Sequence, residues 1–188
     1  MRRLIILFGP PASGKAAIGH ELAGQLGYRF FHNHLTADPV AALFGWGTPT
    51  FGTLVDELRD ILFRHAAADE SIPGIVFTFV WGLELSGHTS FVEKLIARFE
   101  AHGWQVDLVE LLASLETRIA REGTAFRAKW KPNQGDVEAA RQRQRDAEVA
   151  HRMNSGGTLP IARTPLVIDT EAFEPTAAAD EIRRRLSL

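Results

Sequence analysis

Leu4-Ile5-Ile6-Leu7-Phe8-Gly9-Pro10-Pro11-Ala12-Ser13-Gly14-Lys15 is the stretch that decides the fold of this 188-residue chain. Its first five residues form an apolar run typical of a buried strand. The run leads directly into a loop that is bounded by glycines and ends in lysine, and residues 16–26 then follow a helical pattern. A strand, the spacing Gly-x4-Gly-Lys and a helix, in this order, are typical of a phosphate-binding loop.

The residue types in this loop suit a nucleoside triphosphate. Gly9 and Gly14 allow tight turns and a close approach of the backbone to phosphate oxygens. The N–H groups of the loop converge on an anion at the start of the helix, and Lys15 adds a positive charge for the terminal phosphates. We therefore expect ATP to bind the following residues: Gly9, Pro10, Pro11, Ala12, Ser13, Gly14, Lys15, Ala16 and Ala17.

Ala16 departs from the usual motif, in which Ser or Thr follows the lysine and its hydroxyl binds Mg²⁺. A methyl group cannot ligate a metal. We expect Mg²⁺ to be held mainly through water, and we assign no protein residue as a metal ligand. The alternative is a chain that binds nucleotide and has lost catalysis, so the motif is stronger evidence for binding than for turnover.

The composition limits the other possibilities. Apolar residues make up 45% of the chain and charged residues 23%, which is ordinary for a soluble globular protein. The net charge of −2 gives no reason to expect binding to nucleic acid or to an anionic membrane. Cysteine is absent, which excludes disulfides and fits a reducing compartment. We expect a cytoplasmic monomer or homodimer with no membrane-spanning segment.

Strands and helices alternate along the chain, which predicts an α/β fold: a three-layer, doubly wound sheet of five parallel strands. We expect residues 1–188 to form a single domain. A helix over residues 51–68 carries an apolar stripe that contains Leu54, Val55, Leu58, Ile61 and Leu62. The predicted strands cover 3–8, 28–31, 74–80, 104–112 and 166–169, and the other helices cover 15–26, 36–44, 86–102, 115–121, 137–153 and a segment from 175.

The second predicted strand ends in His32-Asn33-His34. In a parallel sheet this end opens onto the ligand cleft, and the period-2 spacing puts both imidazoles on one side. They would contact substrate, accept a proton from its hydroxyl or, less favoured, bind a metal; alternatively they simply cap the strand end or satisfy helix N-termini. If Thr36 caps the next helix, Asp38 lies in its first turn, where it complements the helix dipole or acts as a general base. We name His34, or Asp38 in its place, as the proton acceptor.

The third predicted strand ends in Thr78 and is followed by Trp81 and Glu84. We assign Trp81 and Glu84 to the substrate side, as we do His32 and His34. An acidic residue does not follow the strand directly, which argues against a motor-type ATPase.

A basic segment follows the fourth predicted strand. Between Arg118 and Arg152 there are nine Lys or Arg residues and five Asp or Glu residues. Such a segment suits a lid that closes over phosphates, and we place this lid at residues 123–157. We expect Arg118 to stack near adenine, Arg121 or Arg127 to contact the transferring group, and Asp169 to lie on the nucleotide side. The alternative, a solvated charged helix, is favoured for Arg141, Arg143 and Arg145.

The chain resembles the shikimate-kinase and nucleotide-monophosphate-kinase branch of P-loop small-molecule kinases. The resemblance runs through the loop at 9–15, the element at 115–121 and the terminal Val167-Ile168-Asp169-Thr170. In shikimate kinases the second strand ends in Asp-x-Asp, whereas His32 and His34 stand here, so shikimate is not implied as substrate. The segments Phe-His-Asn-His-Leu-Thr and Phe-Thr-Phe-Val also resemble a group of P-loop proteins described as AAA-family ATPases or shikimate-kinase-like proteins.

These features together predict an ATP-dependent phosphotransferase that acts on a small hydroxyl- or phosphate-bearing acceptor. The second hypothesis, favoured by Ala16, is a nucleotide-binding regulatory module with weak or no ATPase activity. A third, a kinase of RNA or nucleoside ends, draws only on the basic segment and is opposed by the net charge.

Overall fold

The computed structural model describes residues 1–125, 127 and 136–188. Its centre is strand β1 (Arg3–Phe8), whose five apolar residues are fully buried. Four further strands lie parallel to it, in the order β2-β3-β1-β4-β5. They are β2 (Arg29–Phe31), β3 (Gly74–Phe79), β4 (Gln105–Leu112) and β5 (Leu166–Asp169). The predicted parallel sheet is therefore confirmed.

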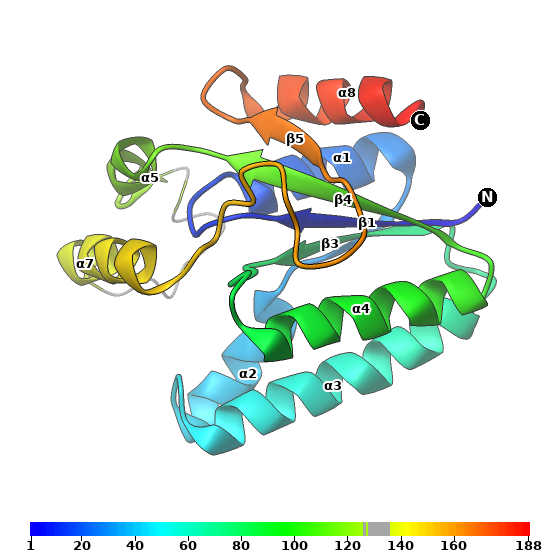
Figure 1. Cartoon of the computed structure of the whole chain (residues 1–188), viewed down its shortest axis with the longest axis horizontal. Helices are drawn as coiled ribbons and strands as arrows, with labels where there is room; N and C mark the ends of the chain where they lie inside the picture. Colours follow the sequence, from blue (N-terminus) through cyan, green and yellow to red (C-terminus); the bar gives the residue numbers. More distant parts are fainter. Residues whose placement is uncertain (126, 128–135) are drawn as a thin grey trace.

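Helices cover both faces of this sheet (Figure 1). On one face α1 (Lys15–Leu26) and α8 (Pro175–Leu186) pack on the odd-numbered side chains of β1. On the other face lie α3 (Pro49–Ala68) and α4 (Ser86–Ala101), which pack on the even-numbered ones. Successive side chains of β1 thus point into two separate cores, one on each face of the sheet. The sheet and the helices on its two faces form the three predicted layers.

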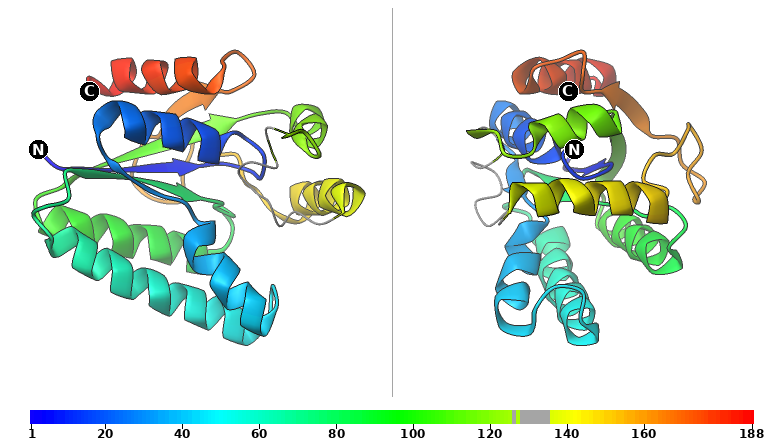
Figure 2. Two further views of the ribbon diagram at one scale, coloured as in Figure 1. Left: turned by 180° about the vertical axis from the view of Figure 1, so that it is seen from behind. Right: turned by 90° about the vertical axis from the view of Figure 1, so that its left-hand side faces the viewer.

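The remaining helices lie toward the carboxyl ends of the strands (Figures 1 and 2). They are α2 (His34–Phe44), α5 (Leu115–Arg121) and α7 (Val137–Ala150). Helix α2 packs on the first half of α3 through Ala37, Val40 and Val55. All loops that leave the carboxyl ends of the strands therefore open toward one edge of the sheet, where ligands of doubly wound folds bind.

The segment between α7 and β5 returns across the face that α3 and α4 cover, and Leu159 joins the core there. Its anchor is Glu110 of β4, a buried carboxylate that accepts the backbone N–H of Ser155 at 2.7 Å and the Ser155 hydroxyl. Residues 136–157, the described part of the predicted lid beyond Arg127, are thus attached to the body of the protein at their end. Residues 126 and 128–135 of that lid lie outside the described residues.

Among the helices within the described ranges, none has the length and apolar character needed to cross a bilayer.

Candidate functional site

The phosphate-binding loop (residues 9–15) connects β1 to α1 in a conformation that needs its glycines. Gly9 has a φ of 140° and Gly14 a φ of 94°. A Cβ atom on Gly9 would lie 2.4 Å from the carbonyl oxygen of Leu111. Lys15 folds back over the loop, because its Nζ donates to the carbonyl oxygens of Gly9 at 2.8 Å and Pro10 at 2.5 Å. A tightly turned backbone and an ammonium group therefore lie together at the sheet edge.

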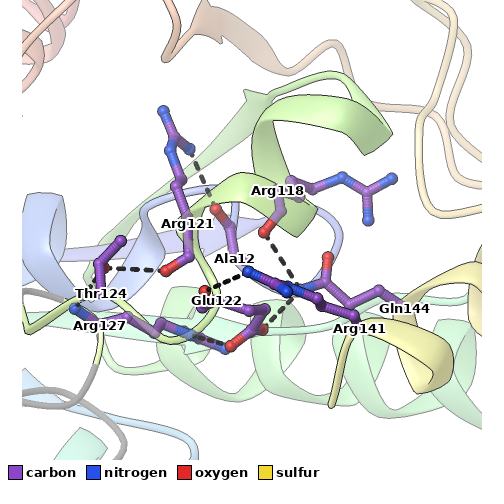
Figure 3. Close-up of polar contacts among 8 residues, drawn as sticks. All are labelled: Ala12, Arg118, Arg121, Glu122, Thr124, Arg127, Arg141 and Gln144. Atoms are coloured by element: carbon purple, nitrogen blue, oxygen red, sulfur yellow. Dashed lines mark hydrogen bonds and ion pairs between the residues drawn. The ribbon is translucent and has the colours of Figure 1, made fainter. Parts of the chain in front are cut away.

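An arginine on another helix also contacts the phosphate-binding loop. Arg121 of α5 donates from Nη1 to the carbonyl oxygen of Ala12 at 3.0 Å (Figure 3). Its Nη2 donates to the carbonyl oxygen of Thr170 at 3.1 Å. Burial lowers the pKa of Arg121 from its ordinary value. Asp169, at the end of β5, accepts the N–H of Glu171 at 2.9 Å. Arg121 thus joins the loop to the connection between β5 and α8.

The protein offers few groups for direct ligation of Mg²⁺ beside this loop. Ala16 has no hydroxyl, and the hydroxyl of Thr78, at the end of β3, accepts the N–H of Asn33 at 3.0 Å. Within residues 1–125, 127 and 136–188, no three His, Asp or Glu side chains gather in a way that would hold a metal ion. Phosphate oxygens and water are ligands that Mg²⁺ accepts, so the residues beside the loop are compatible with this ion next to a bound triphosphate.

The two histidines and Asp38 form one hydrogen-bonded group. Helix α2 begins at His34, two residues before the predicted start, so Thr36 lies inside it and donates its hydroxyl to the Asn33 carbonyl at 3.1 Å. The prediction that Asp38 lies in the first turn is therefore wrong. His34 and Asp38 lie one turn apart on the helix, with Nδ1 and Oδ1 separated by 2.6 Å. His34 and Asp38, which the sequence analysis named as alternative proton acceptors, are therefore hydrogen-bonded to each other.

His32 is bonded to the same helix and lies near the phosphate-binding loop. Its Nδ1 accepts the backbone N–H of His34 at 3.2 Å. Burial lowers the pKa of His32 to about 4, and the neighbouring His34 adds to this effect. The charges of Lys15 and Arg127 act in the same direction, while Asp38 opposes them. His32 is therefore a neutral imidazole at pH 7, and the charges of both Lys15 and Asp38 act on it.

Arg59 of α3 is a buried cation that the sequence analysis missed. Its Nη2 donates to Oδ1 of Asn33 at 2.5 Å, and its guanidinium carbon lies 5.6 Å and 5.5 Å from the ring centroids of Phe79 and Phe91. Burial lowers its pKa from the ordinary value. Within the described residues, its buried Nε has no hydrogen-bond partner. Its burial could have been predicted from the sequence, because Arg59 lies four residues from each of the apolar residues Val55 and Phe63 and therefore on the same face of the helix.

Trp81 and Glu84, which were predicted for the substrate side, lie in different surroundings. Trp81 is fully buried: its ring packs edge-on against Phe8 at 5.4 Å, and its Nε1 donates to the Thr89 hydroxyl at 3.2 Å. The structure thus corrects its assignment to the substrate side, because the ring is buried in the core and has no exposed surface for a substrate. Glu84 contacts the chain after α7, where it accepts from Nδ1 of His151 at 2.6 Å and from the N–H of Arg152 at 3.0 Å.

The arginines of the basic segment divide into different environments (Figure 3). Arg118 is fully buried between α5 and α7, where it pairs with Glu148 and donates from Nε to the Ala113 carbonyl at 3.2 Å. The structure corrects the prediction of an adenine contact here, because this position leaves the guanidinium no exposed face for stacking. Arg127 pairs with Glu122 through two bonds of 3.2 Å, and its charge reaches His32.

Comparison with solved structures identifies the fold. The shikimate kinase from Acinetobacter baumannii, solved with shikimate, superposes with a TM-score of 0.61 at 16% identity over 100% of this chain and 94% of that one. A gluconokinase from Sinorhizobium meliloti gives 0.59 at 15% identity over 100% and 98%. The APS kinase from Mycobacterium tuberculosis, solved with AMPPNP and APS, gives 0.58 at 16% identity over 100% and 98%.

These likenesses extend over the whole chain and establish a P-loop kinase fold. No protein-family model matches the sequence, and no curated protein matches it at a significant level. At identities of 15–16% the comparison concerns the fold, and the chemistry has to be argued from the site itself.

Proposed function

We propose that this chain is a kinase that transfers the γ-phosphoryl group of ATP to a small hydroxyl- or phosphate-bearing acceptor. The observation that carries the proposal is the arrangement at the carboxyl edge of the sheet. There the phosphate-binding loop with Lys15 follows β1, and a hydrogen-bonded imidazole and carboxylate, His34 and Asp38 of α2, follow β2. The charges of Lys15 and Asp38 both act on His32, which precedes α2. Phosphoryl transfer needs little more from a protein than positioning and charge neutralisation.

On the nucleotide side, residues 9–17 would bind the triphosphate of ATP and Lys15 would contact the β- and γ-phosphates. Lys15 would exchange its bonds to the loop carbonyls for bonds to phosphate oxygens. Arg121 would keep the loop in place, and Asp169 lies at the same edge. Bound Mg²⁺ would neutralise phosphate charge, with phosphate oxygens and water as its ligands.

On the acceptor side, Arg59 favours a substrate with a carboxylate or phosphate group. Its Nη1 lies 3.6 Å from Oδ1 of Asp56, a long ion pair, and its buried Nε has no partner among the described residues. An anionic acceptor would add to this charge compensation. Arg59 is bonded to Asn33, the residue between His32 and His34, so its guanidinium lies beside the segment that carries both histidines. An acceptor anchored there would have its hydroxyl toward His34 or Asp38, either of which would take its proton.

The second candidate is a nucleotide-binding regulatory module that turns over slowly or not at all. It is favoured by Ala16 and by the absence of an acidic residue directly after β3. ATP would bind to such a module as to the kinase, but its consumption would not depend on an acceptor.

The test combines a binding and a turnover measurement. Thermal shifts are recorded with ATP and GTP, with and without Mg²⁺, and ADP formation is then followed with hydroxy acids, sugar acids, neutral sugars, nucleosides and nucleoside monophosphates. The kinase predicts ADP formation that rises with an anionic acceptor. A clear ATP shift with no acceptor-dependent ADP formation would favour the module. The absence of any nucleotide shift would contradict both.

A further inference from the structure

The two histidines at the end of β2 make different hydrogen bonds, and these bonds fix different tautomers. We propose that His34, oriented by Asp38, takes the proton of the acceptor hydroxyl at Nε2, while His32 donates a hydrogen bond from its Nε2 to the transferring phosphoryl group. This inference rests on the proposed kinase function and assigns distinct roles to three residues of that site.

The tautomer of His34 follows from its partner. An ionised carboxylate only accepts hydrogen bonds, and Oδ1 of Asp38 lies 2.6 Å from Nδ1 of His34. The ring proton is therefore on Nδ1, and the basic lone pair is on Nε2. A carboxylate in this position fixes the orientation of the ring and stabilises the imidazolium that proton transfer forms. Asp38 is thus a positioning residue, and His34 is the proton acceptor.

The tautomer of His32 is the opposite one. Its Nδ1 accepts the backbone N–H of His34 at 3.2 Å, which requires an unprotonated Nδ1. A neutral ring then carries its proton on Nε2. The low pKa of His32, about 4, keeps this ring neutral across the physiological range. A neutral imidazole N–H is a hydrogen-bond donor that gives no proton away, and this property suits it to the stabilisation of developing charge.

His32 is in ring contact with Phe30 and His34, and it is influenced by charges on the nucleotide side and on the acceptor side of the proposed site. Lys15 on α1 and Arg127 after α5 are close enough for their charges to lower its pKa, and Asp38 on α2 acts in the opposite direction. Its ring centroid lies 5.9 Å from that of Phe30 and 5.2 Å from that of His34. A phosphoryl group in contact with Lys15 would therefore have His32 beside it and His34 on the acceptor side.

The step balances as follows. The acceptor O–H proton moves to Nε2 of His34, and the acceptor oxygen forms a bond to the γ-phosphorus. The bond between that phosphorus and the β,γ-bridging oxygen breaks, and its electron pair leaves with ADP. The products are the phosphorylated acceptor, ADP and an imidazolium paired with Asp38, which then releases its proton to water. The proton on Nε2 of His32 stays in place throughout.

The decisive measurement is ¹H–¹⁵N correlation NMR of the histidine rings in the full chain at pH 7.5, with His32→Gln and His34→Gln for assignment. We expect the proton on Nδ1 in His34 and on Nε2 in His32. Addition of ATP should shift the His32 Nε2–H resonance, and ADP should leave it nearly unchanged, because only ATP has the γ-phosphate. In Asp38→Asn the amide NH₂ can donate to Nδ1 of His34, so its proton should move to Nε2. Asp180→Asn on α8 is the matched control and should change neither ring.

A second variant separates this role from simple helix capping. In His32→Asn the side-chain oxygen can still accept the N–H two residues ahead, so α2 keeps its cap, but the Nε2–H donor is lost. By calorimetry we expect this variant to bind ATP roughly tenfold more weakly and ADP as the parent does. Unchanged ATP affinity would show that His32 is only a cap and would overturn its assigned role.

Other outcomes separate this inference from the kinase proposal. Reversed tautomers, or no response of His32 when a thermal shift shows that ATP is bound, would overturn the inference and leave the kinase proposal intact. A protein in which neither ATP nor GTP causes a thermal shift would refute the kinase proposal itself, whatever the tautomers are.

Discussion

At the scale of single residues, the proposed nucleotide binding is tested at the phosphate-binding loop. Lys15 is the cation whose Nζ lies over the loop carbonyls. Lys15→Ala should abolish the thermal shift by ATP, because the terminal phosphates lose their charged partner. ATP at 100 times its dissociation constant should stabilise the parent by roughly 2.7 kcal/mol. Lys94→Ala, an exposed position on α4, should retain the full shift. An undiminished shift in Lys15→Ala would contradict the proposed site.

The backbone of the loop makes a separate prediction about Gly9. A methyl group there would meet the Leu111 carbonyl at 2.4 Å, at a φ that side chains rarely adopt. Gly9→Ala should therefore lower the free energy of unfolding by about 1–3 kcal/mol or more. Gly24→Ala is the matched control, since it lies exposed in α1 with nothing within 4 Å of the new Cβ. It should raise stability by roughly 0.5–1 kcal/mol. Urea titrations of both variants measure the difference.

His32 makes stability depend on pH. Its pKa is about 4 in the folded chain against 6.5 for an ordinary histidine. Between these values the unfolded chain binds a proton that the folded chain does not, so stability falls as the pH drops from about 6.5 toward 4. His32→Gln should reduce this loss, as seen in urea midpoints at pH 7.5 and pH 5. His65→Gln, an exposed position, should behave like the parent. Equal pH dependence in the parent and His32→Gln would contradict the prediction.

At the scale of elements, α5 and α7 are joined by buried charge. Arg118 is fully buried and pairs with the partly exposed Glu148. Glu148→Ala leaves this guanidinium without its carboxylate and should cost about 1–3 kcal/mol of stability. Glu138→Ala removes a carboxylate of the same helix that pairs with Arg141 and Arg145 at the surface. It should change stability by no more than about 0.5 kcal/mol. Equal losses in the two variants would contradict a structural role for Arg118.

The sequence predicted elements well where local signals act alone. Strand β1 and helix α1 have the predicted limits, since an apolar run and Gly27 define them locally. The start of α2 was missed because its N-cap residue, Asn33, makes no side-chain cap. The N–H of His34 is accepted instead by the imidazole of His32, which does not belong to the usual capping residues. The predicted stripe on α3 was partly wrong: Leu58, Ile61 and Leu62 are exposed, while Arg59 faces inward.

The site shows the same division. The phosphate-binding loop is contiguous, so its spacing alone identifies it. The bond between His34 and Asp38 depends on where the helix begins, and the position of Arg59 depends on the rotation of α3 about its axis. The burial of Arg118 depends on helix α7, whose Glu148 pairs with Arg118 and lies 30 residues further along the sequence. Such contacts between elements leave no local pattern in the sequence.

At the scale of the whole molecule, the chain after α7 is bonded to the connection between β3 and α4. Glu84, between β3 and α4, accepts from His151 and from the N–H of Arg152, and the Leu83 N–H donates to the Arg152 carbonyl at 2.8 Å. Glu84→Ala should speed hydrogen exchange at the N–H of Arg152 and leave the ATP shift unchanged. Glu93→Ala on α4 serves as the control. Unaltered exchange in Glu84→Ala would show that this contact does not hold the segment.

The position of Lys15 has a thermodynamic consequence for the whole protein. Its ammonium group already satisfies the carbonyls of its own loop before any ligand arrives. In the proposed kinase, nucleotide binding would therefore be an exchange of hydrogen-bond partners in a loop that is already ordered, and the entropy cost of ordering the loop falls in the folding step. We expect little change in heat capacity from the loop itself when ATP arrives, since no apolar surface has to be gathered there.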